Sequence, residues 1–525
     1  MSACYLAWMR GASAARGTRV FVWVFSAAAF AAFGCGTGDC GPPSSGDARA
    51  PNILWVVWDT VRADRMSLYG HSVETTPELD RWARGARVYR DVISAASTTE
   101  PAHASMFTGL YPSQHGTDAD HRWLSEDFDT LAERLSSAGY RTYLWSANPS
   151  ISADENFHQG FDRVEHPWDE HYRTAARWVV ERKVADDRSS ELHRRLARGS
   201  AGPWAIKAAG ELVAGALERW LGDSSSDQPW FAVLNYMEAH RPLVPERHFR
   251  ERVMPPEMVE HSYAVDRTWI GMWEYTTGLR DLDARDLRAI QGTYDAAILE
   301  LDGLFADLLD SLEAHGDLEN TMVILTADHG ELLGENHMLD HQFSLHGALV
   351  RIPLVIHFPA RFEPGVETRP VSNMDLYPTL LEVAGVEAGA SNSKAVSLLN
   401  PPLQRARLAE YTAANLRTLR TLTEVHPEFD PAPFGRTLKA LYVEGWKLLR
   451  SSEGEFELFD LEADPFEEVD VFARETERGR VLQQRLEALV VELGSAPTRS
   501  PEGLLAPTAE KREMLESLGY LAPEK

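Results

Sequence analysis

The sequence predicts an α/β fold, in which a doubly wound and mostly parallel sheet is sandwiched by helices. Short apolar segments alternate with segments of helical periodicity over most of the chain, as in parallel strands joined by crossover helices. The first apolar segment, residues 53–58 (ILWVVW), has no polar alternation, so we expect a central strand buried on both faces. Asp59 and Asp328 come just after two such segments, where doubly wound sheets collect ligands.

Four further strands follow from the same pattern. They are residues 142–146, 230–235, 322–326 and 353–357. Helical periodicity appears at residues 131–138 and 294–312. Within the expected catalytic domain, residues 51–399, a helical stretch rich in Arg and Trp at residues 165–223 interrupts the alternation, and we interpret it as an inserted cap. Its arginines form either an ordinary solvated surface or a guide for an anionic substrate.

The C-terminal part, residues 400–525, is predicted to be a small α+β domain. Residues 438–450 and 455–460 suggest an antiparallel hairpin, and a helix is expected near residues 481–493.

The first 35 residues resemble an export signal, because arginines precede an apolar run at residues 20–33 that is short for a membrane span. Cys35 ends a stretch similar to a bacterial lipoprotein cleavage box; simple cleavage and an uncleaved anchor are the alternatives to lipidation. Residues 36–50, rich in Gly, Pro and Ser, would be a flexible linker. We therefore expect an exported protein, periplasmic or extracellular, with a lipid anchor at Cys35 as one arrangement.

Composition narrows the function classes. The net charge of −27 opposes general affinity for nucleic acid or anionic membranes. All cysteines, Cys4, Cys35 and Cys40, precede residue 41, so the folded body has no thiol for a disulfide, a cysteine zinc site or a cysteine nucleophile.

Asp328 and His329 stand side by side after an apolar strand and are followed by Gly330 and Glu331. A carboxylate and an imidazole at a strand end can bind a divalent cation. The triplet Asp-His-Gly also occurs in ordinary loops, so an ordinary loop is the alternative. Asp59 strengthens the metal interpretation. Mostly oxygen ligands with one His admit calcium, manganese or zinc.

Thr99 lies where a short helix is expected to begin, with Pro101 near its first position and Gly109 after its apolar stretch. Free N–H groups and the helix dipole would hold an anion there and favour an alkoxide. A threonine hydroxyl is a poor nucleophile, so metal coordination is the activation it needs. Thr98 or Ser97 could instead be simple helix caps.

Residues 99–109, followed by Tyr111-Pro112 and His115-Gly116, resemble the signature of the sulfatase family, within the alkaline phosphatase superfamily. Further stretches resemble the family in the same order. They are Pro51-Asn52-Ile53, Thr76-Pro77, Thr130-Leu131-Ala132, Asp328-His329-Gly330-Glu331, Arg351-Ile352-Pro353-Leu354, Asp375-Leu376-Tyr377-Pro378, Leu458-Phe459-Asp460-Leu461 and Leu518-Gly519-Tyr520-Leu521. The resemblance implies an alkaline-phosphatase-like fold and one divalent metal ion. The ligands it implies are Asp59, Thr99, Asp328 and His329.

By this resemblance, Thr99 would attack sulfur or phosphorus and form a covalent ester. His240, before Arg241-Pro242, is similar to a family His and would protonate the leaving group, unless it is a core or loop histidine. His103 replaces a family Arg and would orient the nucleophile, contact the substrate anion or serve packing. His341 is similar in place to a family Lys and would stabilise equatorial oxygens. Alternatively it completes a second metal site or belongs to a lid; the candidate partners in that site are Asp340, His337 and His346.

The departures from the family pattern bear on the reaction. Thr99 replaces the cysteine that sulfatases convert to formylglycine, Thr60 replaces the second Asp of an Asp-Asp pair, and Asn148 replaces a Lys. The site therefore resembles threonine-nucleophile relatives, which include phosphodiesterases, phosphonate hydrolases and phospholipid headgroup transferases. A formylglycine hydrate expels sulfate by elimination, whereas a threonine ester must be hydrolysed or passed to an alcohol, which favours phosphorus chemistry.

We predict a metal-dependent hydrolase of sulfuric or phosphoric esters that acts on a small-molecule, glycan or lipid ester. One alternative is a transferase of phosphoethanolamine or phosphoglycerol headgroups, although such enzymes usually have several membrane spans. The other is a non-catalytic binding relative, in which the metal ligands should be eroded. The substrate alcohol, the metal and the oligomeric state do not follow from the sequence.

Overall fold

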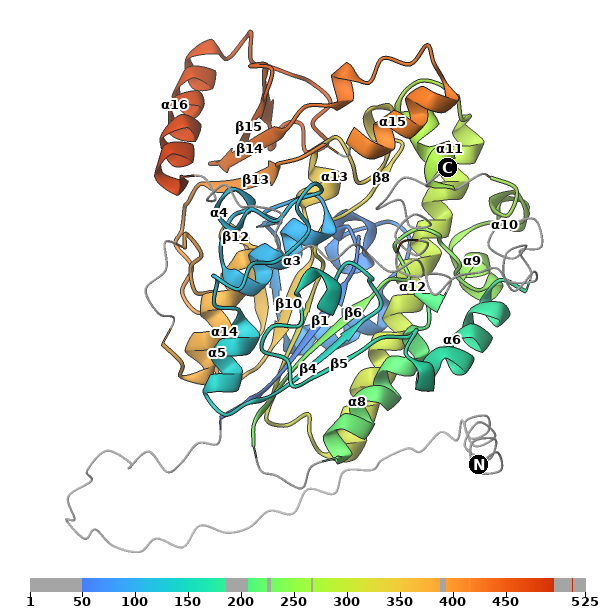
Figure 1. Cartoon of the computed structure of the whole chain (residues 1–525), viewed down its shortest axis with the longest axis vertical. Helices are drawn as coiled ribbons and strands as arrows, with labels where there is room; N and C mark the ends of the chain where they lie inside the picture. Colours follow the sequence, from blue (N-terminus) through green and yellow to red (C-terminus); the bar gives the residue numbers. More distant parts are fainter. Residues whose placement is uncertain are drawn as a thin grey trace, which may run out of the picture. The chain divides into compact units, whose positions relative to one another are not determined.

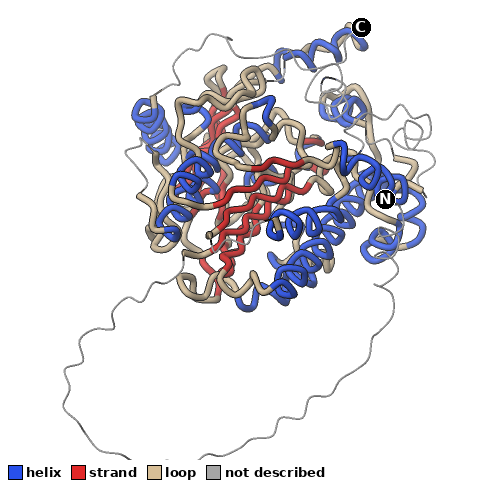
Figure 2. The backbone as a smooth tube through the Cα atoms, turned by 60° about the horizontal axis from the view of Figure 1, so that its bottom comes forward, coloured by secondary structure: helices blue, strands red, loops and turns tan. Residues whose placement is uncertain are grey.

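The computed structural model describes residues 50–185, 206–223, 228–265, 268–387, 393–414 and 416–494, with Arg512. Within these residues an eight-stranded sheet has the order β11-β2-β10-β7-β1-β6-β4-β5. Figure 1 shows α5 and α14 on one side of this sheet and α8 and α12 on the other, and Figure 2 shows the strands enclosed by helices. The predicted sandwich is confirmed. The expected export signal, linker and C-terminal Leu518-Gly519-Tyr520-Leu521 motif lie outside the described residues.

The centre of the sheet is β1 (Asn52–Trp58), which is parallel to β6 (Trp230–Tyr236) on one side and to β7 (Thr321–Thr326) on the other. Every residue of β1 is buried, because helices cover both faces of the strand. β4 (Arg141–Ser146) and β5 (Arg163–Glu165) extend the parallel part. The carboxyl ends of β1, β6 and β7 therefore meet at one edge.

Beyond β7 the sheet becomes mixed. β10 (Leu354–His357) runs antiparallel to both β7 and β2 (Arg87–Tyr89), and β11 (Gly365–Glu367) runs parallel to β2. The sequence does not predict β2 or β11, because a strand of three residues has too little periodicity to be distinguished from a loop.

The helix α12 (Ala284–His315) covers one face and begins ten residues before the predicted start of residue 294. Its first turn is capped by Asp283, whose carboxylate accepts hydrogen bonds from the N–H groups of Arg285 and Asp286. On the sheet side, Phe305 packs edge-on against Trp58 at a centroid distance of 6.1 Å. The other face is covered by α3 (Thr99–Thr108), α5 (Leu131–Ser137) and α14 (Leu376–Ala384).

The described part of the predicted cap contains α6 (Glu170–Lys183) and α8 (Val213–Gly222). Exposed arginines of α6 pair with acidic neighbours, as Arg177 does with Glu181 at 2.7 Å and Arg182 with Glu246 at 2.8 Å. These pairs describe a neutralised, solvated surface, which is the plainer of the two interpretations of the arginine-rich face.

The C-terminal sheet has the order β13-β14-β15-β16 among the described residues and is antiparallel. Its strands are Arg407–Tyr411, Leu438–Val443, Trp446–Ser451 and Phe456–Asp460, and α16 (Thr476–Leu493) follows them. The predicted hairpin and helix are thus present. Glu467 fastens this sheet to the catalytic domain, since its buried carboxylate accepts from His346 Nδ1 at 2.9 Å and from the Gly347 N–H at 3.1 Å.

Several shorter elements complete the described chain. They are α2 (Pro77–Trp82), β3 (Val92–Ile93), α4 (Pro112–His115), α9 (Arg247–Val253), α10 (Pro256–Ser262), α11 (Trp269–Thr276), β8 (Leu332–Leu333), β9 (Leu339–Asp340), α13 (Gly347–Val350), β12 (Val371–Ser372) and α15 (Leu416–Val425). None of the helices that the structure describes combines the length and apolar character needed to span a bilayer.

Gly330, which follows the candidate ligand His329, is required by a close approach of two backbone segments. Its N–H donates to the Leu349 carbonyl at 2.7 Å, and a Cβ at this position would overlap the carbonyl oxygen of Ala348. We expect Gly330→Ala to lower the free energy of unfolding by about 1–3 kcal/mol through this overlap and to reduce activity.

Thermal unfolding and ester hydrolysis measure this effect. The control is Gly303→Ala in α12, where a Cβ meets open space, and which should raise stability by about 0.4–1 kcal/mol. A Gly330→Ala protein as stable and active as the wild type would contradict the packing argument.

Candidate active site

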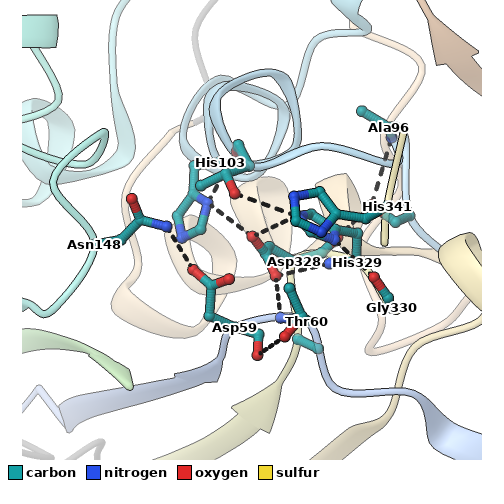
Figure 3. Close-up of polar contacts among 12 residues, drawn as sticks. Asp59, Thr60, Ala96, His103, Asn148, Asp328, His329, Gly330 and His341 are labelled. Atoms are coloured by element: carbon teal, nitrogen blue, oxygen red, sulfur yellow. Dashed lines mark hydrogen bonds and ion pairs between the residues drawn. The ribbon is translucent and has the colours of Figure 1, made fainter. Parts of the chain in front are cut away.

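Three side chains from the ends of two neighbouring strands gather at the carboxyl edge of the sheet (Figure 3). Asp59 follows β1 directly, and Asp328 and His329 follow β7, whose Thr326 is in register with Val57. One ligand atom from each of these three residues lies within 4.8 Å of the others, and all three side chains are fully buried. The strand topology therefore brings together residues that are 269 positions apart.

These residues fit a divalent cation. Asp59 Oδ1 and Asp328 Oδ2 are buried and have no hydrogen-bond partner among the described residues. Burial raises the pKa of each carboxyl group to about 7, and the charge of Asp328 adds to the effect on Asp59. Two adjacent buried carboxylates without a countercharge are costly, and a bound cation would neutralise them.

The remaining carboxylate oxygens are held by protein donors. Asp59 Oδ2 accepts from the side-chain amides of Asn148 at 2.8 Å and Asn235 at 3.3 Å. Asp328 Oδ1 accepts from the N–H groups of Thr60 at 3.1 Å and His329 at 2.8 Å. In each carboxylate, hydrogen bonds to one oxygen fix the orientation of the group and leave the other oxygen available. Hydrogen bonds of this kind commonly orient the side chains that bind a metal ion.

His329 presents Nε2 to the same space. Its Nδ1 lies 2.9 Å from the carbonyl oxygen of Gly330, and since a carbonyl only accepts, Nδ1 carries the proton. Burial, with His341 nearby, lowers the pKa of His329 to about 3, so the ring is neutral. A neutral imidazole with its Nε2 lone pair exposed to two carboxylates has the form of a metal ligand.

Thr60 does not replace the family Asp as a ligand. Its backbone has φ 62°, an uncommon left-handed conformation for a β-branched residue, and its hydroxyl donates to the Asp59 carbonyl at 2.7 Å. The turned backbone aims the Thr60 N–H at Asp328, while Tyr294 OH donates to the Thr60 carbonyl at 2.6 Å. The strain at Thr60 therefore contributes to the orientation of Asp328.

Thr99 is the first residue of α3 and is fully buried. Its Oγ1 lies 3.2 Å from His329 Nε2, and because Nδ1 of that ring carries the proton, the threonine hydroxyl donates. Thr98 is the N-cap residue, but its side chain makes no cap hydrogen bond, and Ser97 Oγ has no partner among the described residues. The simple-cap alternative is therefore not what this segment shows.

His103 lies one turn along α3 and orients this segment. Its Nδ1 donates to the Thr99 carbonyl at 3.0 Å and lies 3.5 Å from Asp328 Oδ2, while its Nε2 accepts from Asn235 Nδ2 at 3.4 Å. Burial lowers the pKa of His103 to about 3. This neutral ring connects Thr99, Asp328 and Asn235, and the orienting role stays a prediction that these contacts allow.

His341 adds positive charge. Its Nδ1 lies 3.1 Å from Glu331 Oε2 and 2.9 Å from Asp340 Oδ1, and its ring lies 4.7 Å from that of His329. Burial alone would lower the pKa of His341, but the two carboxylates outweigh it and raise the pKa to about 10. His341 is therefore an imidazolium, and its charge matches that of the family Lys.

Glu331, Asp340 and His341 form a second group with metal-ligand spacing. Asp340 already accepts from Arg241 Nη1 at 2.5 Å and from Trp273 Nε1 at 2.6 Å. His337 and His346, the two other candidates for the second metal site, lie elsewhere. The ring of His337 packs on Tyr275 at a centroid distance of 4.1 Å, and His346 forms a hydrogen bond with Glu467. That part of the second-metal expectation was wrong.

The ring of His240 also lies near His341, with a distance of 5.2 Å between the two ring centroids. It is fully buried, and its Nδ1 donates to the Arg241 carbonyl at 2.6 Å. Burial, followed by the charge of His341, lowers the pKa of His240 well below its usual range. The predicted metal ligands and catalytic residues thus lie in one connected cluster. They are Asp59, Thr99, His103, His240, Asp328, His329 and His341.

Three further residues of the cluster, Asn235, Arg241 and Trp273, were not predicted from the sequence. Asn235 is the last residue but one of β6 and is in register with Val57 of β1, so the strand-end rule that selected Asp59 could have selected it too. No pattern in the sequence indicates Arg241 or Trp273, because both join the cluster by donating hydrogen bonds to Asp340, which is 99 and 67 positions away in the chain.

Comparison with known proteins decides the family. The family model described as Sulfatase matches residues 51–386, more than half of the chain. The chain belongs to the sulfatase family. A second model, the C-terminal part of N-sulphoglucosamine sulphohydrolase, matches residues 334–494 of this sulfatase-family chain.

Curated relatives of this sulfatase-family chain are distant but extensive. It is 22% identical to an N-acetylglucosamine-6-O-sulfatase of Bacteroides thetaiotaomicron, over 85% of this chain and 88% of that one. It is 26% identical to a choline-sulfatase of Rhizobium meliloti, over 83% and 85% of the two chains. The family and these relatives identify a hydrolase of ester bonds.

Solved structures share the alkaline-phosphatase-like fold. The phosphonate monoester hydrolase of Agrobacterium radiobacter has a TM-score of 0.65 at 20% identity, over 86% of this chain and 100% of that one. A structure solved with its substrate D-glucosamine-2-N,6-O-disulfate has a TM-score of 0.63 at 20% identity, over 85% and 98%.

The unpaired carboxylate oxygens predict that a divalent cation stabilises the protein. At a concentration of 100 times its Kd, calcium, manganese or zinc should raise the free energy of unfolding by about 2.7 kcal/mol, and a chelator should reverse this. Asp328→Asn should abolish the shift. At about pH 8, above the folded pKa of about 7, it should also stabilise the metal-free protein, because it removes one of two adjacent buried charges.

Thermal unfolding with and without each ion measures both effects. The matched control is Asp302→Asn, another buried carboxylate, which accepts from the N–H groups of Glu78 and Leu79 at the start of α2. This variant should keep the metal-dependent shift. A wild-type protein whose unfolding temperature ignores all three ions would contradict the assignment.

Proposed function

We propose that this protein hydrolyses sulfuric or phosphoric esters at a divalent metal site, with Thr99 as the nucleophile. The observation that carries the proposal is the position of Thr99 Oγ1, 3.2 Å from His329 Nε2 at the first residue of α3. The hydroxyl is therefore adjacent to the group of Asp59, Asp328 and His329 that fits a cation. When bound, the cation would lower the pKa of the threonine hydroxyl and attract the oxygen that receives negative charge.

The protein side chains supply the other parts of the reaction. His103 holds the Thr99 carbonyl, which fixes the direction of the hydroxyl. The first N–H groups of α3 and the imidazolium of His341 favour an anionic ester next to Thr99. Thr99 Oγ1 attacks sulfur or phosphorus, the bond to the leaving oxygen breaks, and the leaving oxygen takes a proton.

We assign that proton to the pair of His240 and His341. Their rings lie 5.2 Å apart, His341 carries the charge, and His240 is neutral with its Nδ1 proton committed to Arg241. An anionic ester beside His240 would favour its protonated form, since an opposite charge raises the pKa of an imidazole. In the substrate-free protein the two rings together therefore carry one positive charge, on His341. When the ester binds, His240 takes up a proton and can donate it to the leaving oxygen as a general acid.

Phosphorus esters are the preferred substrates on mechanistic grounds. The product of the first step is an ester on Thr99, which has no second hydroxyl to expel sulfate by elimination. Water must then attack sulfur or phosphorus again and release Thr99, and phosphoryl esters undergo this second displacement readily. Choline-sulfatase and N-acetylglucosamine-6-O-sulfatase, by their names, act on sulfate esters, so sulfate remains a substrate class to be compared.

The two alternative functions differ from this proposal in one step each. A headgroup transferase would use the same Thr99 ester and pass it to an alcohol instead of water. A binding relative would not form the ester. Against the second alternative, the carboxylates of Asp59 and Asp328 and the Nε2 of His329 are intact and oriented, which a site without turnover would not require.

We predict that Thr99→Ala lowers kcat by about 10³-fold or more, because catalysis by a covalent nucleophile is lost. Thr99→Ser should keep part of the activity, since it retains the hydroxyl. The measurement is a panel of an aryl sulfate, a phosphate monoester, a phosphodiester and a phosphonate ester, with intact mass of acid-quenched enzyme to detect the group on Thr99.

The control for this panel is Thr108→Ala, a buried threonine at the end of α3 whose hydroxyl donates to the Ala104 carbonyl inside the helix and accepts from the N–H of Leu110 just after it. Turnover of any panel substrate that survives in Thr99→Ala would refute the nucleophile. Turnover of the aryl sulfate alone would refute the preference for phosphorus.

We further propose that the protein is exported and anchored through Cys35, on the strength of the basic and apolar segments before it. Cys35→Ser should move the protein from the membrane fraction to the soluble exported fraction. Cys40→Ser, five residues along the chain, is the control and should not change the distribution. Equal distribution of the two variants would refute lipidation at Cys35.

A further inference from the structure

A buried lysine of the cap contacts the loop that carries His240. Lys207 is 1% exposed, and its Nζ donates to the main-chain carbonyls of Met237 and of His240, the latter at 2.5 Å. The His240 N–H also donates to the Met237 carbonyl at 3.2 Å, which closes a turn. One ammonium group therefore joins both ends of the turn on which His240 stands.

This lysine is paired with the backbone instead of with a carboxylate. In the same region, Lys183 forms an ion pair with Glu300 at 2.7 Å, and Glu238 accepts from the Gly210 N–H at 2.9 Å. Burial lowers the pKa of Lys207 to about 7, although Glu238 opposes this. A buried ammonium is costly, and at Lys207 the two carbonyls offset the cost by direct hydrogen bonds, while Glu238 adds a negative charge nearby.

The cap also holds the far side of the same loop through apolar contacts. Val244 belongs to a buried cluster with Ile206, Ala208 and Ala209, which flank Lys207 in the sequence. The cap segment 206–209 thus contacts the loop before His240 through hydrogen bonds and after it through packing.

The imidazole of His240 depends on this loop for its position. Its Nδ1 bond to Arg241 lies inside the loop, so it moves with the loop and does not fix the ring relative to His341. The loop is fixed from outside by Lys207 and Val244, as well as by Arg241, whose Nη1 donates to Asp340.

We propose that Lys207 is a positioning residue, through which the cap holds His240 at the correct distance from His341 and from the leaving group. The proposal rests on the proposed function, in which His240 and His341 protonate the leaving oxygen. It gives the cap a role in catalysis that is separate from substrate selection, because a change in the cap changes the proton-transfer step.

The test compares leaving groups. In Lys207→Met, kcat should fall by about 10–100-fold for an ester of an alkyl alcohol, which needs a proton, because general acid catalysis contributes about 10²–10⁴-fold. For a nitrophenyl ester of the same acid, which leaves without a proton, kcat should change less than about threefold, and KM should be similar for both. Equal losses for both esters would overturn the proposal.

The matched control is Lys447→Met. Lys447 is also a fully buried lysine, and it donates to the Leu345 carbonyl and to Glu467 in the C-terminal sheet. This variant should lose stability without changing the ratio of kcat values for the two esters. A change in that ratio equal to the one in Lys207→Met would mean that general destabilisation causes the effect, and would refute the positioning role.

A double-mutant cycle identifies the partner. If Lys207 acts through His240, Lys207→Met should cost less than about twofold in a His240→Ala background, because the residue it positions is absent. A full additional loss would overturn the proposal. Val244→Ala provides a second route if Lys207→Met does not fold, and it should give a smaller change in the same ratio.

Hydrogen exchange separates this proposal from the proposed function. The amides of residues 236–243 should exchange faster in Lys207→Met than in the wild type or in Lys447→Met, whether or not an ester is hydrolysed. A wild type inactive on the whole panel, with faster exchange in Lys207→Met, would refute the ester chemistry and support the contact. Unchanged exchange would refute the positioning role.

Discussion

The site depends on the repulsion between two carboxylates that the fold buries side by side. Asp59 and Asp328 are fully buried at the ends of adjacent parallel strands, and burial raises the pKa of each to about 7. A folded chain can tolerate this arrangement if it binds a proton or a cation between them. The surrounding bonds favour the cation, because Asn148, Asn235 and the N–H groups of Thr60 and His329 all donate to the carboxylates and so stabilise their ionised forms.

The same constraint explains why the nearby histidines differ in charge. His103 and His329 lie beside the carboxylates, but burial lowers the pKa of each to about 3, so both are neutral. His103 can then connect its neighbours through hydrogen bonds, and His329 is a candidate ligand through Nε2. His341 lies between two other carboxylates, Glu331 and Asp340, and is charged. Positive charge is thus held by its own pair of carboxylates, Glu331 and Asp340, next to the ring of His329.

Much of the fold and the centre of the site could be predicted from the sequence, because both follow from local patterns. The apolar run before Asp59 identifies a buried strand, and strand ends identify ligand positions. The fate of His346 could not be predicted. It lies six residues from Asp340, but positive φ angles at Asp340 and Phe343 turn the chain, and His346 reaches Glu467 instead. The contact of Lys207 could not be predicted either. Its Nζ donates to carbonyls of a loop about 30 positions away, and the spacing of residues in the sequence contains no information on that contact.

The departures from the family pattern also bear on the charge of the substrate. Where the resemblance expects two lysines and an arginine, this chain has His341, Asn148 and His103, of which only His341 is a cation. Besides any metal, the described cluster therefore offers the positive charges of His341 and Arg241, and the carboxylates of Glu331 and Asp340 partly offset them. A dianionic phosphate monoester would bring two charges into this buried site, whereas a sulfate ester, a phosphodiester or a phosphonate monoester brings one. We therefore expect charge balance to favour singly charged esters, and among these the proposed ester on Thr99 favours phosphorus.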